Sequence, residues 1–387
     1  MTQPRPVAAR RALGLVFWVN GLAMGIWASQ IPRIKLGFAL NDSGLATIVL
    51  AFAVGGILTM PITGALANRF GSVRTVVTTG LAGALCLALL GAAASYTWLL
   101  AATLFTGVAM GGLDVAMNTQ ATAIQRVWGS PIMSGIHGWF SLGGLAGGVA
   151  GGALTEASIT FQSVLSIAAT LYLVAILAVA SWLHVEAEPA GAAAFALPRR
   201  AVLGIGLLCL LAFFLEGAVF DWTAVYMHDV GGASLGLASA GFTGFSLSMA
   251  ASRFAGDVFV RRFGPACVLA TGAGLAASGI ALACAWPNPF VVTAGLTLAG
   301  FGQANIVPLL FSAAGRVPGV DPGAGIAMAA TMGYGAFLLG PPAIGVLADA
   351  IGLRLTLLLL VGCALAIAAS ARAADPQFPG LPAGRTR

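Results

Sequence analysis

The sequence has very little charge. Only 8% of its 387 residues are Asp, Glu, Lys or Arg, whereas 59% are hydrophobic. A soluble domain carries about 25% charged residues, because it must cover a surface that faces water. Here apolar runs of roughly 20 residues, long enough to cross a bilayer, recur along the whole chain. These proportions exclude a soluble globular protein and predict an all-α membrane protein.

Motifs that carry chemistry are equally scarce. The five cysteines lack the spacing of a metal site and lie in or beside apolar runs, as small buried residues do. The sequence offers no metal cluster, no nucleophile beside a base and no phosphate-binding loop in a suitable context. We therefore expect no enzymatic activity, no cofactor and no metal. The net charge of +6 comes from scattered loop residues, which indicates topology rather than a nucleic-acid partner.

Twelve apolar stretches are predicted to be transmembrane helices. Their connections are short, and the longest is an Ala-, Gly- and Pro-rich stretch at the midpoint, residues 186–199. We expect it to be a cytoplasmic linker between two six-helix bundles, residues 1–185 and residues 200–387, the second with a short cytoplasmic tail. The expected spans are 12–32, 43–67, 75–94, 97–124, 132–154, 160–184, 200–227, 235–259, 265–285, 289–313, 323–348 and 352–372.

Basic residues fix the expected orientation. The first dozen residues could begin a signal peptide, but Asn20, Trp27 and Gln30 interrupt the apolar run that follows, so we expect an uncleaved first helix. With the N-terminus in the cytoplasm, fourteen of the 18 Lys and Arg residues fall on the cytoplasmic side, and only three fall on the other. Positive charge favours the cytoplasmic side. We therefore predict a multi-pass protein of the cytoplasmic (inner) membrane with both termini inside.

A basic-Phe-Gly motif occurs twice, about half the chain length apart, at residues 69–71 and 262–264. Each copy follows a long apolar stretch. A chain of two repeated apolar units is typical of secondary transporters.

These repeated loops resemble those of a known family. GALANRFGSVR (64–74) is similar to the signature between the second and third helices of the major facilitator superfamily, and GDVFVRRFGP (256–265) is similar to its counterpart between helices eight and nine. The glycine-rich stretches 143–154 and 340–352 resemble the fifth and eleventh helices. WASQIP (27–32), GGLDVAMN (111–118), HGWFSLG (137–143) and EGAVFDW (216–222) resemble a YbjJ-like branch of bacterial permeases and, loosely, the fucose permease.

The resemblance implies two pseudo-symmetric six-helix bundles around a central cavity, which opens alternately to each side of the membrane. It also implies a cytoplasmic gate in the repeated loops. Asn68 stands where the family usually has Asp, and Ser72 and Val73 replace two basic residues, so we expect a weaker lock in the first half, while Asp257 keeps a charge in the second. Alternatively, these charges only anchor the topology. The expected gate residues are Gly64, Asn68, Arg69, Gly71, Arg74, Arg126, Arg253, Gly256, Asp257, Arg262, Gly264 and Arg316.

Three acids lie deep in the apolar stretches: Asp114, Glu216 and Asp221. A charge at mid-bilayer costs at least ~2.5–3.5 kcal/mol, so such residues are candidates for function. Asn118 lies one helical turn after Asp114. The resemblance to the fucose permease implies a proton-responsive acid at Asp114 with an Asn at 118. The alternative is a buried acid bonded to small neighbours or water.

Further candidates come from the helices that line the cavity in this superfamily, namely one, four, seven and ten. There Asn20, Asp114, Glu216 and Asn305 could form one ring. A Trp beside polar groups suits a sugar or another ring-bearing solute, although a Trp can also anchor a helix end at the membrane surface. His137 could relay protons or simply pack. The candidate substrate and proton residues are Asn20, Trp27, Asp114, Asn118, His137, Glu216, Asp221, Trp222, Gln303 and Asn305.

Glycines form two rows in the fifth expected span, Gly143, Gly147 and Gly151, and, one residue on, Gly144, Gly148 and Gly152. Residues four apart share a helix face, so the rows predict close backbone approach. Small residues of the eighth span are the expected partners. The contact could slide during transport or be static packing.

We expect a monomeric permease that moves a small polar solute by alternating access and couples it to protons. Its partners would be the solute, protons and the lipid bilayer. One competing hypothesis is an efflux pump for amphipathic compounds, which the embedded acids suit equally well. A less favoured one is a non-transporting membrane sensor or scaffold, which would need an added soluble domain or a long tail.

Overall fold

The computed structural model describes residues 5–129, 132–183 and 199–374. The chain forms two compact units. Unit 1 comprises Met1–Ala194 together with Thr223–Thr243, and unit 2 comprises Phe195–Trp222 together with Gly244–Arg387. The expected linker, residues 186–199, lies outside the described residues except for Arg199. The division into bundles 1–185 and 200–387 therefore stays a prediction.

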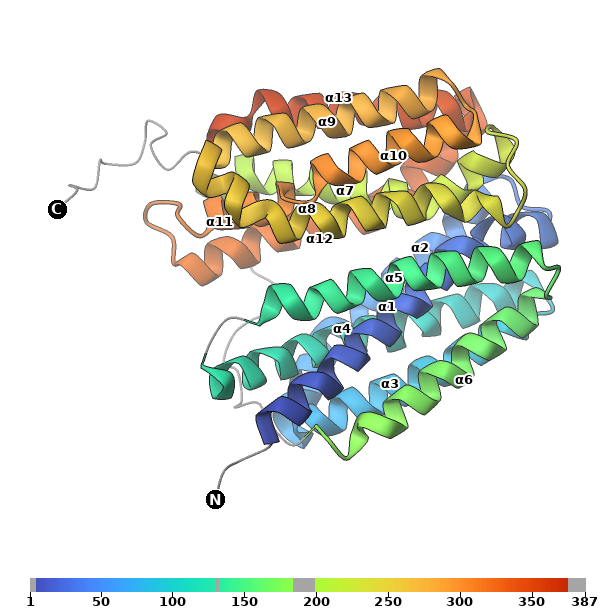
Figure 1. Cartoon of the computed structure of the whole chain (residues 1–387), viewed down its shortest axis with the longest axis horizontal. Coiled ribbons are helices and arrows are strands. Elements are labelled where there is room, and N and C mark those ends of the chain that lie inside the picture. Colours follow the sequence, from blue (N-terminus) through green and yellow to red (C-terminus); the bar gives the residue numbers. More distant parts are fainter. Residues whose placement is uncertain (1–4, 130–131, 184–198, 375–387) are drawn as a thin grey trace. The chain divides into compact units, whose positions relative to one another are not determined.

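Unit 1 is built from the first six helices. α1 packs against α5 and α6, α2 packs against α4, and α3 packs against α4 and α6 (Figure 1). Apolar side chains such as Leu13, Phe17 and Leu113 form its core. The helices are α1 (Arg5–Gly37), α2 (Asp42–Phe70), α3 (Ser72–Gly91), α4 (Tyr96–Trp128), α5 (Met133–Glu156) and α6 (Phe161–Ala180).

A segment from the second half of the sequence completes unit 1. It contains the end of α7 (Arg200–Asp229), the short η1 (Leu237–Ser239) and the first residues of α8 (Ala240–Phe263). η1 packs against α5 and α1. The hydroxyl of Ser234 donates a hydrogen bond to Glu156 Oε2 at 2.6 Å. Unit 1 is therefore not identical to the N-terminal half of the sequence.

Unit 2 repeats the packing of unit 1. α9 packs against α10 and α13, just as α3 packs against α4 and α6. The third helix of each half thus contacts the fourth and sixth spans, as a duplication requires. The remaining elements are α9 (Pro265–Ala285), α10 (Pro289–Gln303), α11 (Ile306–Ala314), α12 (Pro322–Ile351), α13 (Leu353–Ala369) and η2 (Ala371–Ala374).

The predicted all-α fold is confirmed, and most helix ends fall within a few residues of the expected spans. In the described part of the chain, nine helices are long and apolar enough to cross a membrane, and the shorter α13 is also apolar. α1 begins several residues before its expected span, because hydropathy marks the apolar stretch and not the basic turns that continue the helix.

The expected span 289–313 is confirmed as one apolar span, Pro289–Ala314, but its helix is not continuous. Ala304 and Asn305 separate α10 from α11. Pro308 has no N–H, so it cannot donate to the carbonyl oxygen of Ala304, four residues earlier. Instead, Arg253 Nε donates a hydrogen bond to that oxygen at 3.5 Å.

The glycine rows of α5 permit close packing within unit 1. A methyl group on Gly143 would collide with the carbonyl oxygen of Trp18, and one on Gly147 would collide with that of Leu22. This row therefore faces α1 and not the expected eighth span. The second row does meet the eighth span, because a methyl group on Gly148 would lie 2.7 Å from Thr243 Oγ1 of α8.

Candidate functional site

Three of the expected site residues form one connected group in unit 1. Asn118 Nδ2 donates to the carbonyl oxygen of Asp114 at 2.8 Å and to Asp114 Oδ1 at 3.3 Å. His137 Nε2, from α5, lies 3.1 Å from Asn118 Oδ1. The His137 ring also meets the Phe17 ring edge-on, with centroids 5.2 Å apart. We call Asp114, Asn118 and His137 the acid–amide–imidazole cluster.

The hydrogen bonds of this cluster indicate which ring nitrogen of His137 carries a proton. Because the Asn118 amide nitrogen donates to Asp114, its oxygen must accept, and the matching His137 tautomer carries its proton on Nε2. Asp114 and Asn118 are half-buried, whereas His137 is exposed. Two titratable groups are therefore held by one amide, and one of them is open to water or a solute.

Asn20 and Trp27 serve the packing of unit 1. Both side chains are buried. Asn20 Oδ1 accepts from the Tyr172 hydroxyl at 3.1 Å, which ties α1 to α6. The Trp27 ring stacks on Phe52 of α2, with centroids 5.7 Å apart. Sequence reasoning missed Tyr172, although a single tyrosine in the mainly apolar stretch 161–180 was a signal for a polar partner.

A second polar group lies at the helix break of unit 2. Arg253 Nη2 lies 3.6 Å from Glu216 Oε1, and the same guanidinium contacts the freed carbonyl of Ala304. Asn305 Nδ2 lies 3.3 Å from Ser252 Oγ. Arg253, expected in the gate, is thus the ionic partner of Glu216. Its position six residues inside the expected span 235–259, away from the basic loop, could have signalled this.

The other expected residues of unit 2 are held separately. Gln303 Nε2 donates to the carbonyl oxygen of Ala212 at 3.1 Å. Its Oε1, like Trp222 Nε1, is buried without a hydrogen-bond partner among the described residues. Asp221 is half-buried.

The repeated loop motif has the same geometry in both units. The Arg69 guanidinium lies over the Phe70 ring at 5.2 Å, and that of Arg262 lies over Phe263 at 5.4 Å. The glycines that follow, Gly71 and Gly264, have φ of 92° and 79°, which favours glycine over residues with a side chain. The motif therefore ends one helix and begins the next in the same way twice.

The two loops differ in register before these glycines. Asn68 lies three residues before Gly71, and the residue three before Gly264 is Arg261. Asp257 lies seven residues before Gly264, so it does not occupy the position of Asn68. Its side chain is outside the described part of the structure.

Ser72 has a structural reason to differ from the basic residue usual in the family. It is fully buried, and its hydroxyl donates to Gln120 Oε1 of α4 at 2.6 Å. A basic side chain here would bury a charge.

The remaining expected gate residues have diverse surroundings. Arg316 donates to Ser312 Oγ and to the carbonyl oxygen of Ala374, so it joins α11 to η2. A methyl group on Gly256 would collide with Asn305 Oδ1, whereas one on Gly64 would meet nothing within 4 Å. Arg74 and Arg126 are exposed.

An ion cluster that sequence reasoning did not assemble lies at the opposite end of unit 1. Lys35 Nζ lies 2.5 Å from Asp42 Oδ1 and 2.6 Å from Asp229 Oδ2. Asp229 belongs to the segment that completes unit 1. The lysine thus joins α1, the start of α2 and the end of α7. The sequence separation of 194 residues between Lys35 and Asp229 hid this contact.

Comparisons with known proteins agree with this architecture. Residues 13–270 match the family model of the Major Facilitator Superfamily. An uncharacterized MFS-type transporter of Yersinia pestis is 36% identical over 93% of this chain and 94% of its own length. The membrane protein MosC of Rhizobium meliloti is 32% identical over 98% of this chain and 94% of its own length.

Solved structures support the fold. The nucleoside transporter NupG aligns with a TM-score of 0.75 over 95% of this chain and 98% of that chain, at 16% identity. A bacterial homologue of the human lysosomal transporter Spinster aligns with a TM-score of 0.71 over 96% and 97% of the two chains, also at 16% identity. With its duplicated helical units and repeated loops, this chain belongs to the major facilitator superfamily and is a multi-pass membrane transporter.

Proposed function

We propose that this chain is a proton-coupled secondary transporter that moves a small polar solute across the cytoplasmic membrane by alternating access. The observation that carries the proposal is the acid–amide–imidazole cluster of unit 1. Ionisable residues inside membrane segments mark substrate and ion pathways, because their charge is expensive to keep there.

Asp114 and Glu216 differ in how their charges are balanced, and this difference favours Asp114 over Glu216 as the proton carrier. Glu216 has Arg253 at 3.6 Å, so its negative charge is already compensated. No Lys or Arg of the described chain lies within ion-pair distance of Asp114. A proton is therefore the direct means of neutralising Asp114, and Asn118 can bond either protonation state.

The proposed orientation places both termini in the cytoplasm. It rests on the basic residues at the start of α1, between α2 and α3, and at the end of α4, which outnumber those at the opposite ends of these helices. The solute would be small and polar, since the cluster presents an amide and an imidazole rather than an apolar surface.

Proteoliposomes with an imposed pH gradient test the proposal. Exposed to a metabolite mixture, wild-type vesicles should accumulate one solute class against its gradient. Asp114→Asn imitates the protonated acid and keeps its shape. It should therefore lower accumulation of the solute by about tenfold or more, while the exchange of labelled for unlabelled solute continues. Mass spectrometry of the vesicle contents measures both.

Glu216→Gln is the matched control, because it neutralises a second deep acid by the same change from a carboxylate to an amide. It leaves Arg253 uncompensated, so we expect weaker transport overall but a retained response to the pH gradient. If Glu216→Gln loses that response while Asp114→Asn keeps it, the proton site lies in unit 2. If neither variant changes accumulation, proton coupling through these acids is wrong.

A further inference from the structure

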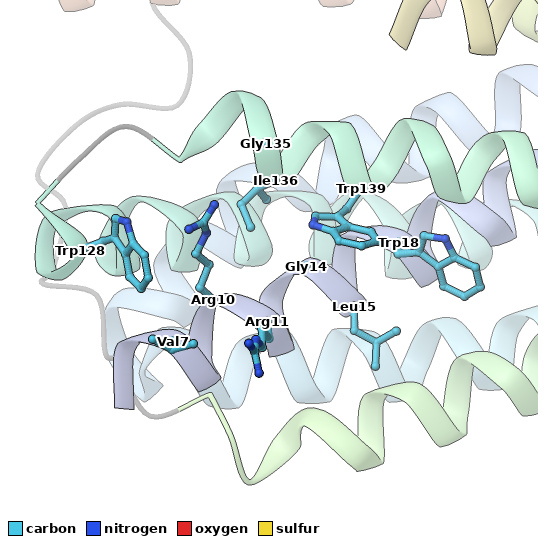
Figure 2. Close-up of a pocket in the computed structure, with 10 residues that line it drawn as sticks. All are labelled: Val7, Arg10, Arg11, Gly14, Leu15, Trp18, Trp128, Gly135, Ile136 and Trp139. Carbon is cyan, nitrogen blue, oxygen red and sulfur yellow. The ribbon is translucent and has the colours of Figure 1, made fainter. Parts of the chain in front are cut away.

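Unit 1 has an open pocket of about 730 Å³ where the start of α1, the end of α4 and the start of α5 meet (Figure 2). Arg10, Arg11 and Trp18 line it from α1, where helical spacing brings them to one side. Trp128 is the last residue of α4, and Trp139 lies in the second turn of α5. In Figure 2 Arg10 lies between these two indoles, and Arg11 lies below it. None of the cluster residues Asp114, Asn118 and His137 lines the pocket.

The arginines are open to an anion. Both side chains are exposed, and the Arg10 guanidinium lies over the Trp128 ring at 4.8 Å. Among the described residues, no carboxylate lies within ion-pair distance of either arginine. Stacking on an indole fixes the plane of a guanidinium but leaves its edge N–H groups free to donate, and these groups match phosphate oxygens.

Further along α1 the pocket becomes apolar. Trp139 is 50% exposed and Leu15 is 37% exposed. Gly14 lets the Trp139 indole approach α1, because a methyl group at Gly14 would lie only 3.2 Å from Trp139 Cδ1. The pocket therefore has a basic end at the start of α1 and an apolar wall that continues toward the middle of the helix.

We propose that this pocket binds an anionic phospholipid, with the phosphate of its head group on Arg10 and Arg11 and an acyl chain along Leu15, Trp18 and Trp139. A basic pocket between transmembrane helices is suited to an anionic lipid head group. A free phosphate would use the arginines but leave the apolar wall without a role. In the proposed orientation the lipid belongs to the cytoplasmic leaflet, but the binding itself does not depend on that orientation.

Native mass spectrometry of the purified full-length protein tests the site. The protein is mixed with equal amounts of phosphatidylglycerol and phosphatidylcholine, and the bound lipids are counted. Wild type should retain phosphatidylglycerol preferentially. Arg10→Gln/Arg11→Gln should weaken its retention about tenfold or more, since each surface arginine contributes appreciably to binding an anionic lipid.

Arg199→Gln/Arg200→Gln is the matched control, because Arg199 and Arg200 are also an exposed basic pair at the start of a helix, α7. It should retain phosphatidylglycerol as wild type does. Arg10→Lys/Arg11→Lys keeps the charge and should bind more strongly than the Gln pair, which separates loss of the site from misfolding. Trp139→Ala should weaken lipid retention by removing the apolar wall.

Three results would overturn the proposal. The first is equal retention of phosphatidylglycerol and phosphatidylcholine by wild type. The second is equal loss in the two Arg-to-Gln pairs, which would indicate general attraction to positive charge. The third is displacement of the lipid by millimolar inorganic phosphate with no effect of Trp139→Ala, which would indicate a soluble anion. Since no readout involves transport, failure here is distinct from failure of the proton-coupling experiment.

Discussion

At the residue scale, several buried polar groups are bonded by a protein partner instead of water. Ser72 bonds Gln120, Tyr172 bonds Asn20, and Arg253 takes the carbonyl that Pro308 leaves free. A polar group left unpaired away from water costs about 1–3 kcal/mol, so each of these contacts limits what can replace its members. The departure from the usual family residue at Ser72 therefore has a local structural cause.

Ser72→Ala should lower the thermal stability of the purified protein. The change removes a buried O–H donor and should cost about 1–3 kcal/mol, which differential scanning fluorimetry in detergent can detect. Ser72→Arg, which restores a basic residue, should cost more, because it buries a charge. Ser278→Ala is the control: Ser278 is exposed on α9 and bonds only the carbonyl oxygen of Gly274 in its own helix. If the two alanine variants melt alike, the Ser72–Gln120 bond contributes little.

At the element scale, the glycines of α5 allow α1 to pack closely against it, and Pro308 explains the interruption of the tenth span. The sequence predicted close approach along α5, because residues four apart share a face. It did not identify α1 as a partner, since a row of small residues fits any neighbouring helix. The break at Ala304–Asn305 was foreseeable from Pro308, but a run of apolar residues is read as one helix when only hydropathy is considered.

Gly147→Ala should destabilise the protein by roughly 1–3 kcal/mol, because the added methyl group meets the Leu22 carbonyl oxygen and the helices must separate. Gly204→Ala is the control, since a methyl group there meets nothing within 4 Å. Alanine favours helix by up to about 1 kcal/mol over glycine, so the control should be neutral or stabilising. The measurement is the unfolding temperature of each variant. Equal destabilisation of the two variants would contradict α1–α5 packing through Gly147.

The candidate site was predictable in part for the same physical reasons. Asp114 and Asn118 share one helix face, so their contact follows from spacing. The contact of His137 with Asn118 and the pairing of Arg253 with Glu216 each join two different helices. A single sequence gives no distance between helices, so Asn20 and Trp27 were assigned to the cavity although the structure packs them inside unit 1.

At the scale of the whole molecule, the duplication is visible in the architecture, and the proposed orientation rests on the charge asymmetry. The loop glycines Gly71 and Gly264 and their Arg–Phe pairs coincide in geometry, and the third helix of each half has corresponding neighbours. These features could be predicted from the sequence, because the same motif occurs in both halves of the chain.

Reporter fusions test the proposed topology. Fusions at Ala190 and at the C-terminus should both behave as cytoplasmic, because each lies beyond an even number of spans. A fusion at Pro287, between α9 and α10, lies beyond an odd number and should behave as external. An external signal from the C-terminal fusion would contradict the twelve-span topology.

Because unit 1 includes the segment Thr223–Thr243, its parts are synthesised at different times. During synthesis the six helices of unit 1 are complete long before this segment exists. Lys35 then has Asp42 but must wait for Asp229, 194 residues further along the chain, and Glu156 must wait for Ser234. The first unit therefore finishes folding only after the ribosome has entered the second half, and a chain that stops at the midpoint leaves both of these contacts unmade.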